Sequence, residues 1–274
     1  MTKRVLIGSA AVLGIAAVVL AIAVGGLGAG TDSDAVSGSA PMPRAAVATG
    51  AATPLRAESS DPRRPVPTVR RQPRRGRYFG ILQVSEGARA ALFASPGGRF
   101  ISSVSDHSGF GSPRVFAVAR QGGSWLGVIT PLRPDGEVGW VRFDAAKLRL
   151  YWTRYSLRVL LSKRSLQLRY GDRVLGRYTV TVGAAGSGTP RGRFGITDAL
   201  AFDHSPFYGC CALALSGHQE HLPVGWLGGN RIAIHGTPGP VGYAASHGCI
   251  RATDDTMHVL FRRVPLGTPV FVKG

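Results

Sequence analysis

A thiol and two imidazoles stand close together near the carboxyl end of this sequence. His235 lies in residues 234–237 (IHGT), and Cys249 lies in residues 246–251 (SHGCIR), two positions after His247. A cysteine attacks carbonyl carbon as the thiolate, and an ordinary thiol is mostly protonated at neutral pH, so a neighbouring histidine is the usual activating base. An extended chain would point His247 and Cys249 to one face, whereas His235 would arrive from a neighbouring strand. The spacing predicts nucleophilic cysteine chemistry, with either imidazole as the base.

Glycines accompany both segments. Gly236 and Gly248 carry no side chain at positions where a substrate backbone would have to approach. The successive backbone N–H groups of residues 247–249 could bind the oxyanion of a tetrahedral intermediate. The pattern therefore offers a nucleophile, a base and an oxyanion site in one neighbourhood.

At these residues the chain resembles the L,D-transpeptidase family, cysteine-type enzymes that cross-link peptidoglycan. The signature of that family is an IHGT-like segment and a later (S/T)HGC segment followed by Arg or Asn, and the sequence matches each position. Upstream, residues 157–161 and 165–170 look like the family's opening strands, and residues 189–196 (TPRGRFGI) are similar to its TPxGxF segment. The resemblance covers residues 155–274 and implies a catalytic domain of the L,D-transpeptidase β-sandwich type.

The resemblance also implies roles for individual residues. Cys249 is implied as the nucleophile and His235 as its base, with the carbonyl group of Gly236 orienting the imidazole through its other ring nitrogen. His247 and Gly248 would flank the oxyanion site. We expect these five residues to be the catalytic set.

Four more residues are expected to bind substrate. Ser246 supplies a hydroxyl that would hold the loop, and Arg251 would either grip a substrate carboxylate or brace the turn. Tyr208 and Trp226 precede the catalytic histidine in a segment that could cover the groove, where they would either pack on a stem peptide or belong to the core. Residues 217–221 (GHQEH) in that segment depart from the usual form of the family.

The implied reaction needs no cofactor. Cys249 would attack the carbonyl carbon preceding the terminal D-alanine of a tetrapeptide stem, release D-alanine and leave a thioester. The side-chain amine of a diamino acid in another stem would then accept the acyl group, which joins third residues in a 3-3 cross-link. Attack by water would instead make the protein an L,D-carboxypeptidase, and another acceptor would attach a wall polymer.

Two alternatives of other classes stay open. A zinc hydrolase could use His235, His247 and Cys249, or His218 and His221, as ligands, but the chain has no HExxH motif. A non-catalytic wall-binding protein is the second alternative, and the intact set of His, Ser, Gly, Cys and Arg argues against it. We expect no metal at the catalytic residues.

The amino end predicts a membrane anchor. After Lys3 and Arg4, residues 5–31 carry no charge and are rich in Val, Ile, Leu and Ala. About 20 apolar residues cross a bilayer, whereas the core of a signal peptide is shorter, so residues 1–31 are expected to be an uncleaved signal anchor or transmembrane helix. The two basic residues keep the amino end cytoplasmic, which leaves the catalytic domain outside the cell membrane on the wall side. Cleavage would give a secreted form.

Residues 32–76 are dominated by Ala, Ser, Pro, Gly and Arg, which predicts a disordered linker. The 274-residue chain carries a formal net charge of +18, and its 33 Lys and Arg residues outnumber 15 Asp and Glu residues. No nucleic-acid motif accompanies this charge, so nucleic acid is not an expected partner. Peptidoglycan stem peptides, which carry carboxylates, and anionic wall polymers suit it better. The sequence indicates no oligomeric state.

Residues 77–152 predict a separate all-β domain before the catalytic domain of residues 153–274. Five short strands are expected, at residues 80–84, 90–93, 114–119, 124–128 and 139–142. Their spacing favours a small barrel, and residues 137–141 (EVGWV) resemble the last strand of SH3-like bacterial wall modules. The fold class expected is mainly β, with an SH3-like barrel followed by the catalytic sandwich.

Two adjacent cysteines, Cys210 and Cys211, complete the thiol inventory. They could be two small buried residues on a strand, a redox-sensitive pair, or the source of a partner for Cys249. We expect burial on a strand, because a disulfide to Cys249 would consume the nucleophile.

Overall fold

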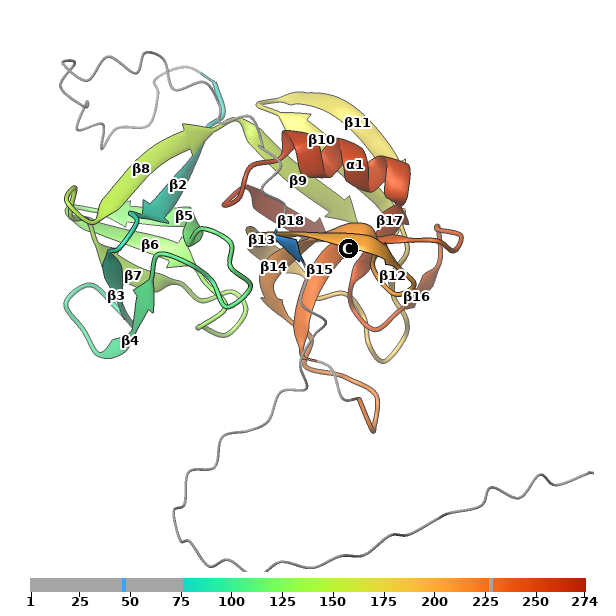
Figure 1. Cartoon of the computed structure of the whole chain (residues 1–274), viewed down its shortest axis with the longest axis horizontal. Coiled ribbons are helices and arrows are strands. Elements are labelled where there is room, and N and C mark those ends of the chain that lie inside the picture. Colours follow the sequence, from blue (N-terminus) through green and yellow to red (C-terminus); the bar gives the residue numbers. More distant parts are fainter. Residues whose placement is uncertain (1–45, 48–75, 227–228) are drawn as a thin grey trace, which may run out of the picture. The chain divides into compact units, whose positions relative to one another are not determined.

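The computed structural model describes residues 46–47, 76–226 and 229–274 (Figure 1). This part of the chain contains eighteen strands and one helix, so the protein is mainly β, as predicted. The predicted transmembrane segment, residues 1–31, lies outside the described residues, as does most of the predicted linker. No helix in the described ranges has the length and apolar character needed to cross a membrane.

The first β domain is a seven-stranded sheet in which every neighbouring pair is antiparallel. Its strands follow one another in the order β4-β3-β7-β6-β5-β2-β8. They are β2 (Phe79–Val84), β3 (Arg89–Phe93), β4 (Phe100–Ser105), β5 (Val115–Gly122), β6 (Trp125–Ile129), β7 (Gly139–Arg142) and β8 (Leu148–Thr153).

Five of these strands fall where the sequence predicts them, and β4 and β8 are additional. Strand β4 (FISSVS) contains three serines, and only Val104 is fully buried in it, so its hydrophobic signal is weak. Strand β8 (LRLYWT) buries only its two end residues and pairs with β2 along one side. The resemblance to SH3-like modules stays a prediction.

The domain predicted to be catalytic, called the catalytic domain below, is built on a nine-stranded sheet. Eight of its strands follow the order β11-β10-β9-β18-β13-β14-β15-β17, and β1 pairs with β13. Its strands are β1 (Ala46–Val47), β9 (Tyr155–Leu160), β10 (Ser165–Tyr170), β11 (Arg173–Thr179), β13 (Gly192–Ser205), β14 (Gly209–His218), β15 (Arg231–Thr237), β17 (Ile250–Thr253) and β18 (Pro269–Lys273). Strand β1 is a two-residue piece of the segment predicted as linker.

The opening hairpins show how the sequence specifies these strands. Strand β10 lies where it was predicted and pairs antiparallel with both β9 and β11. The turn into β11 is two residues long, and its Gly171 has a φ of +60°, a conformation that glycine adopts without a Cβ clash. In β10, Leu166 and Leu168 are completely buried.

Helix α1 (Asp254–Arg263) follows directly on β17 and contacts β14, β15 and β17. Thr253 caps its first turn by accepting a hydrogen bond from the N–H of Thr256, and acidic residues in the first turn and arginines in the last turn suit the helix dipole. Met257 and Leu260 are buried on the face toward the sheet. The helix is thereby fixed against the strands that carry the predicted catalytic residues.

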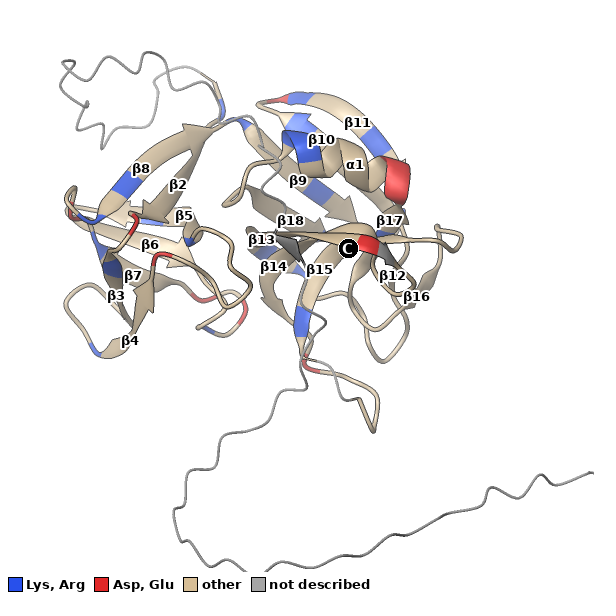
Figure 2. Cartoon of the chain, viewed as in Figure 1, with Lys and Arg blue, Asp and Glu red and all other residues tan. Residues whose placement is uncertain are grey.

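Each β domain has its own hydrophobic core. The core of the first domain includes Leu82, Leu92 and Val128, and that of the catalytic domain includes Ile234 and Ile250, on the two strands that bear the predicted site. Lys and Arg residues are spread over strands of both domains and the last turn of α1 (Figure 2).

Candidate active site

Strands β15 and β17 bring the two sequence segments together. They pair in parallel, with Ile234 opposite Ile250 and His235 opposite Arg251. Because side chains alternate along a strand, the two isoleucines enter the core and His235 shares the other face with Arg251. Cys249 directly precedes β17, two positions before Arg251, whose charge acts on both Cys249 and His235.

His235 is held as a neutral imidazole. Its side chain is only 3% exposed, and its Nδ1 lies 2.7 Å from the carbonyl oxygen of Gly236, the contact expected from the sequence. A carbonyl oxygen only accepts, so Nδ1 carries the proton and Nε2 has a free lone pair. Burial lowers the pKa of His235 to about 4, and the charge of Arg251 acts in the same direction.

The thiol of Cys249 is half-buried and protonated at neutral pH. Burial raises its pKa, while the backbone N–H of Ala233 and the positive charge of Arg251 act in the opposite direction. The hydrogen bonds of the described residues include none between this thiol and the imidazole of His235 or His247. The sulfur would therefore have to turn toward a base before it could pass on its proton, as is common in free enzymes.

Ser246 fixes the loop that carries Cys249. Its completely buried hydroxyl accepts the N–H of Gly248 at 3.2 Å and donates to the carbonyl oxygen of Cys249 at 2.5 Å. Gly248 has a φ of +112°, which a residue with a side chain rarely adopts. The N–H group of Gly248 is thus already used. None of the described hydrogen bonds uses the N–H group of His247 or of Cys249.

The glycine-rich segment after β11 braces the same loop. Strands β12 (Val182–Gly183) and β16 (Ala244–Ser246) form a parallel pair, and the carbonyl oxygen of Ser246 accepts from the N–H of Ala184 at 2.8 Å. The hydroxyl of Ser187 also lies 3.3 Å from that carbonyl oxygen. The segment thus holds the loop in place.

Gln219 is a site-shaping residue that sequence reasoning missed. Its buried amide donates to the carbonyl oxygens of Ser187 and Gly188 at 3.0 and 2.8 Å, and its Oε1 accepts the N–H of His221 at 2.9 Å. The same side chain occupies the space where a Cβ at Gly248 would lie. Gln219 falls in the GHQEH stretch that departs from the family pattern, so no motif pointed to it.

The two aromatic residues predicted to contact substrate both lie beside histidines of the predicted catalytic set. The Tyr208 ring packs edge-on against His235, with centroids 5.1 Å apart, and Trp226 packs against His247 at 5.2 Å. Trp226 is 42% exposed, and burial raises the pKa of the half-buried Tyr208, with the neighbouring Cys249 adding to the effect. Tyr208 therefore shields the imidazole, and Trp226 offers an open ring face.

Arg251 is the cation of the site. Its backbone exchanges two hydrogen bonds with Thr181, at 2.8 and 2.9 Å, which fixes the residue beside β12. Its Nε is buried and has no hydrogen-bond partner in the described structure. The charge acts on both His235 and Cys249. The backbone bonds fit the bracing role, and the unpaired Nε leaves the guanidinium able to bind an anion.

A groove adjoins the site on the side of the glycine-rich segment. Its lining includes Gly183, Gly188, Thr189, Arg191 and His221. Gly183 pairs with Ser246 and donates its N–H to the Thr189 hydroxyl at 2.9 Å, so one residue that lines the groove pairs with the loop of the candidate nucleophile.

The ligand sets of the zinc alternative are not assembled. Among the described residues, the cluster whose atoms could surround one metal ion consists of Cys210, Cys211 and His258, not of the histidines and cysteine of the predicted site. All three cysteines are free thiols, and Cys211 is buried on β14, as expected. The candidate site is therefore a cysteine and histidine pair built on two parallel strands.

Comparison with known proteins shows which family the chain resembles. The family model described as the L,D-transpeptidase catalytic domain (YkuD) matches residues 154–272. YkuD of Bacillus licheniformis is 35% identical over 120 residues, which cover 43% of this chain and 65% of that protein. YqjB of Bacillus subtilis is 30% identical over 125 residues, 42% of this chain and 69% of that protein. Both proteins carry L,D-transpeptidase names.

Among solved structures, an L,D-transpeptidase from Mycobacterium smegmatis has 18% sequence identity and a TM-score of 0.35, covering 50% of this chain and 73% of that one. The chain spans about two thirds of the length of the curated relatives it matches. The family model spans both His235 and Cys249, and on these sequence matches the chain belongs to the L,D-transpeptidase family with a YkuD-type catalytic domain.

Proposed function

We propose that the chain is a peptidoglycan L,D-transpeptidase in which Cys249 is the nucleophile and His235 is its base. The observation that carries this proposal is the state of His235: a buried imidazole whose Nδ1–H is held by Gly236, with Nε2 free to accept a proton. A neutral base near a free thiol is what general-base activation of a cysteine requires.

The first half-reaction forms a thioester. The thiol of Cys249 turns toward Nε2 of His235, loses its proton to it and attacks the carbonyl carbon preceding the terminal D-alanine of a tetrapeptide stem. The N–H groups of His247 and Cys249, which no described protein group engages, would bind the oxyanion. When the C–N bond breaks, protonated His235 returns the proton to the departing amine of D-alanine.

The second half-reaction transfers the acyl group. The side-chain amine of a diamino acid in another stem attacks the thioester, His235 takes the proton of that amine, and the thiolate departs as a new amide bond forms. This amide would be the 3-3 cross-link. Water in place of the amine gives an L,D-carboxypeptidase, and an amine on another wall component gives polymer attachment.

Arg251 would hold the substrate and ease ionisation of the thiol. Its charge already opposes the effect of burial on the pKa of Cys249. In the complex, its unpaired buried Nε would meet a carboxylate of the stem peptide. The adjoining groove, with Arg191 and His221, supplies further polar groups for a peptide.

The same reaction predicts where the protein works. Peptidoglycan lies outside the cytoplasm, which agrees with a membrane anchor in residues 1–31 and a catalytic domain on the wall side. Proteolysis of intact cells or spheroplasts should then remove the folded part. Protection equal to that of a cytoplasmic marker would contradict this location, and a shortened chain in the medium would indicate the secreted form.

The deciding experiment is mass spectrometry of muropeptides after incubation of the purified full chain with tetrapeptide-stem substrate. Dimers joined between third residues, with release of D-alanine, are expected. Tripeptides alone would identify a carboxypeptidase. Unchanged substrate in the presence of a correctly folded protein would contradict both.

A further inference from the structure

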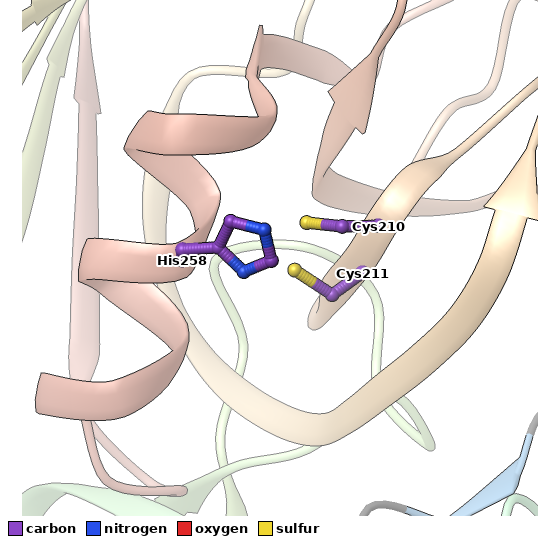
Figure 3. Close-up of side chains that lie close together, drawn as sticks. All are labelled: Cys210, Cys211 and His258. Atoms are coloured by element: carbon purple, nitrogen blue, oxygen red, sulfur yellow. The ribbon is translucent and has the colours of Figure 1, made fainter.

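A second group of sulfur and imidazole atoms lies away from Cys249. Cys210 and Cys211, at the start of β14, both direct their sulfur atoms toward the ring of His258 on α1 (Figure 3). The two Sγ atoms and one nitrogen atom of His258 all lie within 4.8 Å of one another. Sequence reasoning did not pair these residues, because 47 positions separate them and no metal motif has that spacing.

The dimensions of this group suit one thiophilic ion. Zinc binds cysteine sulfur at about 2.3 Å and histidine nitrogen at about 2.0 to 2.1 Å, which places two ligand atoms of a tetrahedral ion about 3.5 to 3.8 Å apart. The separations present are close enough for small side-chain rotations to reach that geometry. Cys211 is buried, Cys210 is half-buried and His258 is exposed. One side of the site is therefore buried in the protein, and the other side is open to solvent.

Asp254 supports the arrangement. It lies one helical turn before His258 on α1, so both side chains occupy one face of the helix. Its Oδ1 accepts the N–H of Cys210 at 3.2 Å, and the same oxygen fills the space beside Gly209 and Gly236 where a side chain would clash. The carboxylate therefore orders the backbone of Cys210 and adds negative charge beside the two thiols.

Ordinary packing does not explain the histidine. No hydrogen bond or ion pair of the described residues uses the His258 ring, although it stands over the two sulfur atoms. A cysteine thiol that binds no metal ion ordinarily keeps its proton at neutral pH. A bound cation would displace these protons and supply the positive charge that the group lacks.

We propose that Cys210, Cys211 and His258 form a binding site for a thiophilic transition-metal ion of the Zn²⁺ class, with water at the fourth position. Binding replaces two S–H protons by two metal–sulfur bonds and joins β14 to α1. The next residue of β14, Ala212, pairs with His235, so the ion would stiffen the strand that supports the catalytic imidazole. The site is separate from the reacting atoms and leaves Cys249 free.

The test is metal titration of the full chain, reduced and stripped of metal. The variant Cys249→Ala serves as the background, since it removes the remaining thiol. One equivalent of Zn²⁺ should bind in competition with a chromophoric chelator, and Co²⁺ should give a sulfur-to-cobalt charge-transfer band. Because even loss of an outer-shell partner costs about 10- to 100-fold in metal affinity, Cys211→Ser should weaken Zn²⁺ binding by at least about 100-fold.

His258→Ala tests the proposal even if the cysteine variants fold poorly. His258 is exposed on the helix surface, so its substitution should leave the fold intact. It should weaken binding by at least about 10-fold, whereas the matched variant His107→Ala, at an exposed histidine of the first β domain, should not. The proposal is overturned if the Cys249→Ala protein binds no Zn²⁺, if His258→Ala binds it as tightly as its background, or if Cys210 and Cys211 form a disulfide that reductant does not open. Each result is obtained without turnover, so it is independent of the proposed function.

Discussion

The catalytic domain contains two groups of sulfur and imidazole that are made of the same residue types but set in different backbones. Cys249 lies in a loop held by the Ser246 hydroxyl, next to backbone N–H groups that no described protein group uses. Cys210 and Cys211 lie at the start of a strand and face His258 across a strand–helix contact. The first arrangement presents one sulfur and oxyanion donors, whereas the second presents three ligand atoms to one point.

The two histidines differ as well. His235 is buried, and its Nδ1–H is fixed by a carbonyl oxygen, so it stays neutral and can accept a proton through Nε2. His258 is exposed and has no such partner. Residue type alone therefore does not separate a catalytic pair from a ligand set; burial, the second ring nitrogen and the surrounding N–H groups do.

The largest effect that follows from this comparison is expected for Cys249→Ala. Removing the nucleophile abolishes the thioester pathway, so transpeptidation should fall by at least about 10³-fold while the protein stays folded. The other two thiols remain in this variant. Turnover near the wild-type rate would mean that one of them is the nucleophile, and an unchanged thermal unfolding midpoint would exclude misfolding as the cause of a loss.

His235→Ala should have the next largest effect. Loss of a general base typically costs about 10² to 10⁴-fold, and a small thiolate fraction would leave slight turnover that improves as pH rises toward the pKa of the thiol. The measurement is the pH dependence of turnover, with His107→Ala as the matched histidine control. A variant that is fully active at neutral pH would remove His235 from the mechanism.

The pH profile of the wild-type protein distinguishes a buried from an ordinary histidine. A base must be unprotonated, and burial lowers the pKa of His235 to about 4, so activity should rise with pH through about 4 and change little between pH 5 and 7. The measurement is the rate of covalent reaction with a carbapenem, an acylating agent implied by the family resemblance, with protein fluorescence confirming the fold at each pH. An acidic limb near 6.5 would show that the imidazole is not buried as described.

The smallest predicted effect concerns the scaffold. Ser246→Ala leaves the half-buried carbonyl group of Cys249 without its donor, which should lower the free energy of unfolding by about 0.5 to 1.5 kcal/mol. Denaturant titration measures this loss, and the acylation rate should fall because the loop loses its anchor. An unchanged unfolding free energy would show that the hydroxyl does not hold the loop.

The sequence specifies much of this domain because several local signals agree. Alternating apolar residues and the Gly171 turn locate β10 and its neighbours, and the IHGT and SHGC segments predict the catalytic set. The parallel pairing of β15 with β17 explains why segments more than ten residues apart meet.

Other features depend on tertiary contacts that leave no local pattern. Gln219 acts through carbonyl groups of a segment some thirty residues earlier. The local sequence does not distinguish His258 from any other exposed helix residue. Its place beside the two cysteines follows from the packing of α1 against β14. The serine-rich strand β4 is formed by pairing with β3 rather than by its own weak apolar pattern.

The most direct test of the central claim is to locate the acyl group. The full chain is mixed with a carbapenem or a tetrapeptide stem, quenched, and examined by intact mass and peptide mapping. The account predicts one covalent adduct, carried by the sulfur of Cys249 and absent from the Cys249→Ala protein. An adduct on Cys210 or Cys211, or one that persists in the Cys249→Ala protein, would contradict it.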